Sequence, residues 1–306
     1  MTSLSRRQIL AATGAAIVLG TAPAQARGSL GATPEPSPVA DLHPSLVTAK
    51  ELAGRQDAAS LVAVMPDDAF AKGRIAGSIQ LDWAELELKD TSDKSVAAWT
   101  AKMQELVAVR GIRADRPAVV YDEGTLFAAR GWWQLAYLGY PLPAILDGGL
   151  PAWIAAGETA ESGPVGIAPV EAPLPENATV QRSLLATKTD VLAALDGPDV
   201  LLVDARAPEE YAAGHIPGAR NVPYTDNAVM KSPHVYKSAD ALRAMYEAAG
   251  VTPDERVMTY CSTGVRGSVA YVSLRLAGYR DVALYVGSWN EWGADPTTPK
   301  TTGDRP

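Results

Sequence analysis

Cys261 is the only cysteine of the chain, and its surroundings are suited to holding a negative charge. The residues that follow it are Ser262, Thr263, Gly264, Val265 and Arg266. A loop of this kind that runs into a helix gathers backbone N–H groups at the positive end of the helix dipole, and Gly264 allows the tight turn. Arg266 adds a fixed cation, while Ser262 and Thr263 offer hydroxyl donors. These features favour a reactive sulfur anion over a small buried hydrophobic side chain.

The composition argues against several other kinds of site. A single thiol cannot form an intramolecular disulfide, and one cysteine with three histidines does not suit a cysteine-based metal centre, so we expect no metal and no cofactor. The formal net charge is -8, and no basic stretch alternates with aromatic residues, which argues against nucleic acid as a partner. One small anion in a local basic site remains compatible with this charge.

The elements around Cys261 occur twice along the chain. In each copy an apolar segment precedes a Gly-basic-Ile-x-Gly pattern, a second apolar segment precedes a polar loop with glycine, and a tryptophan-containing motif follows. This alternation predicts an α/β protein with two tandem domains, each a parallel sheet flanked by helices on both faces. Such sheets bind ligands at the carboxyl ends of their strands, where Cys261 would lie. The matching stretches are 61–64 with 201–204, 73–78 with 214–219, 118–121 with 256–260, and 148–153 with 287–292.

The N-terminal residues 1–26 are predicted to be a cleavable export signal. Arg6 and Arg7 precede an apolar run, and a small-x-small pattern ends at Ala26, which is the layout of a twin-arginine signal. The run is too short and too rich in glycine and alanine for a membrane span, so we expect a periplasmic or secreted protein with no stable span after cleavage. Composition then predicts a flexible leader at 27–40, an N-terminal domain at 41–157, a proline-rich linker at 158–182 and a C-terminal catalytic domain at 183–300.

Three stretches in this order resemble the tandem-domain rhodanese family, which comprises thiosulfate and 3-mercaptopyruvate sulfurtransferases. They are a signature at 202–219, the loop from Cys261 to Arg266, and a C-terminal signature at 285–292. The resemblance implies that Cys261 is a nucleophile that takes sulfane sulfur from a small anionic donor as a persulfide. Cyanide or a thiol then accepts the sulfur, and a protein acceptor is left open. The loop residues would bind the anion.

The resemblance also implies roles for residues outside the loop. Arg206 would contact the anionic donor or brace the loop, and the alternative is an ion pair with Asp204 or Glu210. Asp204 and His215 would support the site from beneath rather than take part in the chemistry.

The first copy resembles the inactive N-terminal domain of tandem rhodaneses, because it lacks the thiol. Asp122 stands near the corresponding place, where a carboxylate would repel an anionic donor. We expect this domain to form one wall of the cleft, with Trp83 or Arg130 in the wall. Trp132 and Trp133 are assigned to its core.

The loop fits neither common donor class of the family. Thiosulfate enzymes typically carry basic residues directly after the cysteine, and mercaptopyruvate enzymes carry small ones, whereas Ser262 and Thr263 are neutral and hydrogen-bonding. We favour thiosulfate, because a dianion could use Arg266, Arg206 and the backbone N–H groups, and we keep 3-mercaptopyruvate as the alternative. The physiological donor and acceptor, the oligomeric state and the cleavage position are left open.

Two functions of other classes also remain open. A persulfide carrier would deliver sulfur to a partner protein without turning over a small acceptor. A cysteine-dependent phosphatase would use a Cys-x5-Arg loop, but Arg266 follows Cys261 by five positions, so this loop is one residue short of that pattern. A smaller loop suits sulfur better than phosphate.

Overall fold

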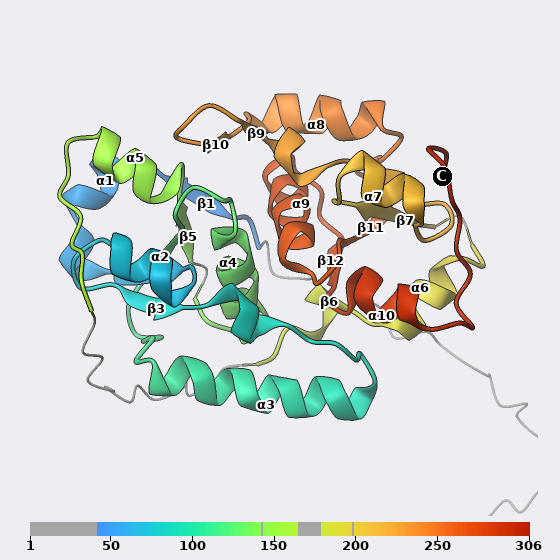
Figure 1. Cartoon of the computed structure of the whole chain (residues 1–306), viewed down its shortest axis with the longest axis horizontal. Coiled ribbons are helices and arrows are strands. Elements are labelled where there is room, and N and C mark those ends of the chain that lie inside the picture. Colours follow the sequence, from blue (N-terminus) through green and yellow to red (C-terminus); the bar gives the residue numbers. More distant parts are fainter. Residues whose placement is uncertain (1–41, 142, 165–178, 198) are drawn as a thin grey trace, which may run out of the picture. The chain divides into compact units, whose positions relative to one another are not determined.

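The computed structural model describes residues 42–141, 143–164, 179–197 and 199–306 (Figure 1). The predicted export signal and leader lie outside the described residues, as do residues 165–178 of the predicted linker. All described residues belong to one compact unit.

The first domain is built on a parallel sheet of five strands in the order β1-β5-β4-β2-β3. The strands are β1 (Ser45–Val47), β2 (Ser60–Val64), β3 (Ile79–Leu81), β4 (Ala118–Tyr121) and β5 (Ala144–Leu146). The helices are α1 (Ala49–Ala53), α2 (Asp67–Lys72), α3 (Asp93–Val109), α4 (Ala128–Tyr137) and α5 (Gly149–Ala155), with short 3-10 helices η1 (Gln56–Ala58) and η2 (Trp83–Leu86).

The second domain repeats this plan with a parallel sheet in the order β6-β12-β11-β7-β8. The strands are β6 (Leu185–Ala186), β7 (Val200–Asp204), β8 (Arg220–Asn221), β11 (Arg256–Tyr260) and β12 (Val282–Tyr285). The helices are α6 (Lys188–Ala194), α7 (Pro208–Ala213), α8 (Ala239–Ala248), α9 (Val265–Leu276) and α10 (Ser288–Ala294), with η3 (Arg182–Leu184) and η4 (Tyr224–Asn227). The equivalent strand orders confirm the repeat predicted from the sequence.

Both faces of each sheet are buried under helices. In β2, Val62 and Val64 pack into the core that contains α3 and α4, while Leu61 and Ala63 pack into the core that contains α1, α2 and α5. Successive strand residues point to opposite faces, so strands buried on both sides must be apolar throughout. In the second sheet Val203 likewise packs into the core on one face, while its neighbour Leu202 packs into the core on the other face. The predicted fold class is therefore confirmed.

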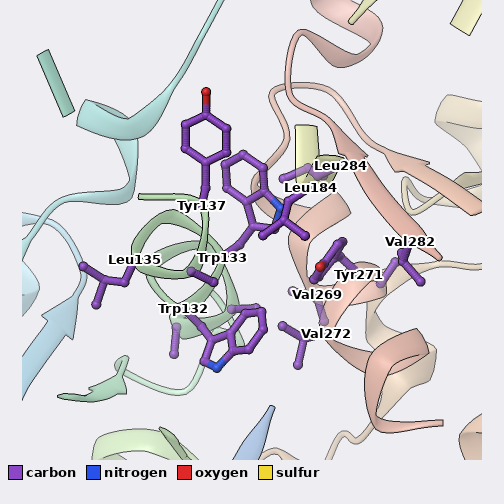
Figure 2. Close-up of a cluster of buried hydrophobic side chains, with 14 of the residues drawn as sticks. Trp132, Trp133, Leu135, Tyr137, Leu184, Val269, Tyr271, Val272, Val282 and Leu284 are labelled. Atoms are coloured by element: carbon purple, nitrogen blue, oxygen red, sulfur yellow. The ribbon is translucent and has the colours of Figure 1, made fainter. Parts of the chain in front are cut away.

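The helices that follow the two central loops pack against each other, α4 from the first domain and α9 from the second. The labelled side chains of Trp132 and Tyr271 belong to these two helices (Figure 2), and their ring centroids lie 6.2 Å apart. Trp132 and Trp133 are fully buried, which confirms their assignment to the core. A single apolar cluster consequently runs through both domains and includes Cys261.

A short antiparallel hairpin of the second domain reaches the first. It consists of β9 (Ala228–Val229) and β10 (Val235–Tyr236). Nδ1 of His234, just before β10, lies 2.7 Å from the carbonyl oxygen of Gly124 in the first domain. Within the part of the chain that the structure describes, no helix combines the length and apolar character needed to cross a membrane.

Candidate active site

Cys261 stands directly after β11, the central strand of the second sheet, and is buried. The backbone N–H of Gly264 donates to its sulfur, with N and Sγ 3.1 Å apart. Gly264 has φ of 90°, and a Cβ at this position would lie 3.1 Å from the carbonyl oxygen of Val286. Glycine is therefore required both by the backbone conformation and by the close approach of the neighbouring chain.

The loop is held from behind by the start of α10. The N–H of Cys261 donates to Oγ of Ser288 at 3.2 Å, and this hydroxyl donates to the carbonyl oxygen of Tyr285 at 2.8 Å. The N–H groups of Trp289 and Asn290 donate to the carbonyl oxygens of Cys261 and Ser262. These bonds explain why the C-terminal signature accompanies the cysteine loop. Sequence reasoning missed Ser288, although it lies within that signature.

Arg266 is paired with a carboxylate within the site. Its Nη1 and Nη2 lie 2.6 and 2.9 Å from the two carboxylate oxygens of Glu210, and Nη2 also donates to Oγ of Ser262 at 2.7 Å. Hydrogen bonding from Arg266 lowers the pKa of Glu210 to about 2. The same pairing raises the pKa of Arg266, and the nearby charge of Cys261 adds to this effect. The predicted cation is thus present beside the loop, largely neutralised by Glu210.

The predicted loop residues are brought together by the turn into α9. Ser262 and Thr263 are half-buried, while Gly264 and Val265 are buried. The hydroxyl of Ser262 also donates to Glu210, with the oxygens 3.3 Å apart. Glu210 was considered only as an alternative partner of Arg206, and the structure places it against the loop instead.

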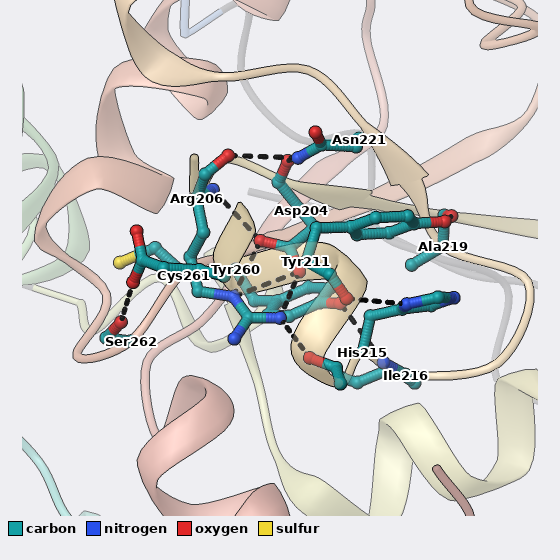
Figure 3. Close-up of polar contacts among 12 residues, drawn as sticks. Asp204, Arg206, Tyr211, His215, Ile216, Ala219, Asn221, Tyr260, Cys261 and Ser262 are labelled. Carbon is teal, nitrogen blue, oxygen red and sulfur yellow. Dashed lines mark hydrogen bonds and ion pairs between the residues drawn. The ribbon is translucent and has the colours of Figure 1, made fainter. Parts of the chain in front are cut away.

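Arg206 is buried in an ion pair with Asp204, as Figure 3 shows. Its Nε lies 3.0 Å from both carboxylate oxygens, and its Nη2 lies 2.6 Å from Oδ2 of Asp204 and 2.7 Å from the carbonyl oxygen of Gly214. The guanidinium carbon also lies 4.6 Å from the ring centroid of Trp289. The structure therefore shows the ion pair that was the alternative to donor binding, and the partner is Asp204 rather than Glu210.

His215 lies beneath the site and is fully buried. Its ring stacks on Tyr211 with centroids 3.7 Å apart, and its two nitrogens lie 2.9 and 3.0 Å from the carbonyl oxygens of Tyr211 and Arg305. These contacts join α7 to the C-terminal segment, which agrees with a supporting position.

Asp122 stands directly after β4, the central strand of the first sheet, and matches Cys261 in place. It is buried, and its carboxylate accepts hydrogen bonds from the N–H groups of Gly124, Thr125 and Ala128 at 2.6, 3.1 and 2.7 Å. Burial raises the pKa of Asp122, and these hydrogen bonds oppose the rise. In the first domain the carboxylate of Asp122 itself binds the backbone N–H groups of the loop. It therefore has a structural role in addition to the expected repulsion of anions.

Aromatic side chains from both domains meet near the loop. Trp83 packs edge-on against Phe127 with ring centroids 5.6 Å apart, and Phe127 lies 6.0 Å from Tyr224 of the second domain. Tyr224 belongs to η4, which packs against α9 directly after the cysteine loop. Trp83 thus contacts the second domain through Phe127. Phe127 was not predicted from the sequence, because a single apolar residue carries no local signal for a contact between domains.

No cluster of three or more histidine, cysteine, aspartate or glutamate side chains suited to a metal ion occurs among the described residues. Cys261 is a free thiol. The groups beside the sulfur are the backbone N–H of Gly264 and, through Ser262, the guanidinium of Arg266.

A family model for the rhodanese-like domain matches residues 48–156 and again residues 187–295. The thiosulfate sulfurtransferase of Pseudomonas aeruginosa is 33% identical over 267 residues, which cover 84% of this chain and 96% of that protein. The 3-mercaptopyruvate sulfurtransferase of Escherichia coli is 35% identical over 210 residues, which cover 63% of this chain and 71% of that protein.

Among solved structures, the anaerobic ergothioneine biosynthesis enzyme from Chlorobium limicola superposes with a TM-score of 0.71 at 22% identity. The match covers 84% of this chain and 70% of that one, and at this identity it shows a shared fold.

Proposed function

Because this chain belongs to the rhodanese family, we propose that it is a sulfurtransferase that carries sulfane sulfur on Cys261. The observation that carries this proposal is the N–H of Gly264 directed at a buried sulfur at the end of the central strand. A backbone donor in this position stabilises a sulfur anion, which is the reactive form of a thiol. The equivalent residue of the first domain is Asp122, whose carboxylate cannot accept a sulfur atom as a persulfide.

The reaction consists of two displacements at sulfur. The Cys261 thiolate attacks the outer sulfur of thiosulfate, a new S–S bond forms, and the old S–S bond breaks with its electron pair leaving on sulfite. Cyanide then attacks the outer sulfur of the persulfide, the S–S bond to Cys261 breaks, thiocyanate leaves and the thiolate is restored. Both steps conserve charge, and neither requires an oxidant, a reductant or a metal.

Thiosulfate is the donor that this proposal favours. The thiosulfate sulfurtransferase of Pseudomonas aeruginosa matches over 84% of this chain, whereas the mercaptopyruvate enzyme of Escherichia coli matches over 63%. A dianionic donor also suits the backbone N–H of Gly264 at the sulfur and the guanidinium of Arg266 beside the loop.

The proposal is tested by following thiocyanate formation from thiosulfate and cyanide. We expect turnover by the wild-type protein and none by Cys261→Ser, with 3-mercaptopyruvate run in parallel as the competing donor. A wild-type protein that is silent with both donors, although correctly folded by circular dichroism, would contradict the proposal of an enzyme and favour a persulfide carrier.

Mass spectrometry distinguishes a sulfurtransferase or persulfide carrier from a phosphatase. Incubation with thiosulfate alone should add the mass of one sulfur atom to Cys261, and subsequent cyanide should remove it. Hydrolysis of p-nitrophenyl phosphate that depends on Cys261 would favour the phosphatase instead.

We also propose that the protein is exported to the periplasm or beyond through a twin-arginine signal. Arg6 and Arg7, the apolar run behind them and the small residues before Arg27 support this proposal. N-terminal sequencing of the exported protein should start at Arg27. Replacement of Arg6 and Arg7 by lysine should leave the precursor in the cytoplasm, and unchanged export of this variant would exclude a twin-arginine route.

A further inference from the structure

Arg130 is a fully buried arginine of α4 that has no carboxylate partner in the described structure. Its Nη2 donates to the carbonyl oxygen of Leu86, while its Nε and Nη1 have no hydrogen-bond partner among the described residues. The guanidinium carbon lies 4.9 Å from the ring centroid of Trp133, which supplies a favourable but weak contact for a cation. A guanidinium buried in this way is unfavourable unless an anion compensates it.

Arg130 lies in the first turn of α4, next to a contact between the two domains. Its own side chain contacts Leu86, Trp99 and Trp133 of the first domain. Phe127 precedes it by three residues, so the two side chains share a helix face, and Phe127 contacts Tyr224 of the second domain. The 3-10 helix η2 joins this face, because its Trp83 packs on Phe127 and its Leu86 accepts from Arg130.

Arg130 also lies within electrostatic range of the catalytic sulfur. Burial lowers the pKa of Arg130 to about 10, and the charge of Cys261 opposes this change. The guanidinium therefore stays protonated at neutral pH. Since α4 packs against α9, which follows the cysteine loop, the first domain brings a cation to the sulfur of the second.

The other two arginines near the loop are already neutralised. Arg206 is bound to Asp204, and Arg266 is bound to Glu210 through both carboxylate oxygens. Among these three arginines Arg130 is the one that forms no salt bridge with a described carboxylate, and the charge of Glu87 acts on it without direct contact.

We propose that Arg130 binds the anionic group of the sulfur donor and so selects donors that carry a negative charge. This inference rests on the proposed sulfurtransferase function. In thiosulfate the oxygens are two bonds from the sulfur that Cys261 attacks, so they must arrive close to the cysteine. These oxygens would supply acceptors for the N–H groups on Nε and Nη1 of Arg130, which have none among the described residues.

The test compares two reagents that alkylate Cys261 by the same reaction and differ in charge. Iodoacetate is an anion and iodoacetamide is neutral, so the ratio of their rates measures the preference of the site for negative charge. We expect Arg130→Gln to lower this ratio by about tenfold to a hundredfold, the effect of one hydrogen bond to a charged group. The KM for thiosulfate should rise in the same variant.

Two further variants control this measurement. Arg130→Lys keeps the cation and should retain much of the ratio, while Arg113→Gln removes an exposed arginine that pairs with Asp115 and should leave it unchanged. Thermal unfolding checks each fold. Loss of an uncompensated buried charge should leave Arg130→Gln at least as stable as the wild type.

Equal slowing of both reagents by Arg130→Gln would mean that Arg130 acts on the thiolate and not on the incoming anion, which contradicts the inference. An unchanged ratio would contradict it as well. Alkylation requires no sulfur transfer, so a wild type that forms no thiocyanate would count against the proposed function, whereas the ratio would still report on Arg130.

Discussion

Asp122 and Cys261 directly follow the central strands of two sheets with equivalent strand order, and each accepts a hydrogen bond from the glycine of its own loop. In the first domain the N–H of Gly124 binds a carboxylate, and in the second the N–H of Gly264 binds sulfur. Loops at corresponding places thus bind a buried carboxylate in one domain and the cysteine sulfur in the other.

The carboxylate of Asp122 should stabilise the first domain without taking part in the reaction. Asp122→Ala would leave one buried and two partly buried backbone N–H groups without this acceptor, and we expect a loss of about 1–3 kcal/mol in the free energy of unfolding. Urea titration measures this loss. Asp122→Asn keeps one acceptor and should lose less stability. An unaltered stability of the alanine variant would show that these N–H groups need no carboxylate.

Gly264→Ala should impair the loop more than its backbone conformation alone would predict. Gly157 has a similar φ of 89° with open space around it, so Gly157→Ala gives the cost of the left-handed conformation, about 1 kcal/mol. At Gly264 the added Cβ also meets the carbonyl oxygen of Val286. We therefore expect a larger loss of stability and slower persulfide formation. Equal effects of the two substitutions on both measurements would argue against this.

The ion pair between Arg206 and Asp204 should be structural. Arg206→Met would leave the carboxylate of Asp204 buried without its partner, at a cost of about 3–5 kcal/mol. The double variant with Asp204→Asn should recover part of this stability. If instead Arg206 bound the donor, the double variant would fold well and show a sharply raised KM for thiosulfate.

The ion pair between Glu210 and Arg266 should make stability depend on pH in the acid range. The pKa of Glu210 is lowered from 4.5 to about 2, so between these values the unfolded chain binds more protons than the folded one. The contribution of the pair is complete above about pH 4.5 and is lost as the pH falls towards 2. The Glu210 side chain is 40% exposed, so solvent screening limits this contribution to about 1 kcal/mol.

Glu210→Gln measures this dependence. The difference in unfolding free energy between the wild type and this variant should be largest at pH 6 and should shrink at pH 3. A constant difference across this range would show that the pair does not contribute through its charge.

The amino-acid sequence alone was sufficient to predict the two-domain α/β fold and to single out Cys261. Strand periodicity, the spacing of glycines and the residues after the cysteine are local properties, and they recur in both copies. The signature at 285–292 could also be found, although its Ser288, which holds the loop through the N–H of Cys261, was not recognised.

The tertiary structure decided which charges face the sulfur. Whether Arg206 meets Asp204 or an incoming donor depends on burial and rotamer, and the sequence left both open. The charge of Cys261 acts on Arg130 because folding brings the two domains together. Charge interactions act through space and through burial, so a residue 131 positions from the cysteine can influence it in a way that no local pattern predicts.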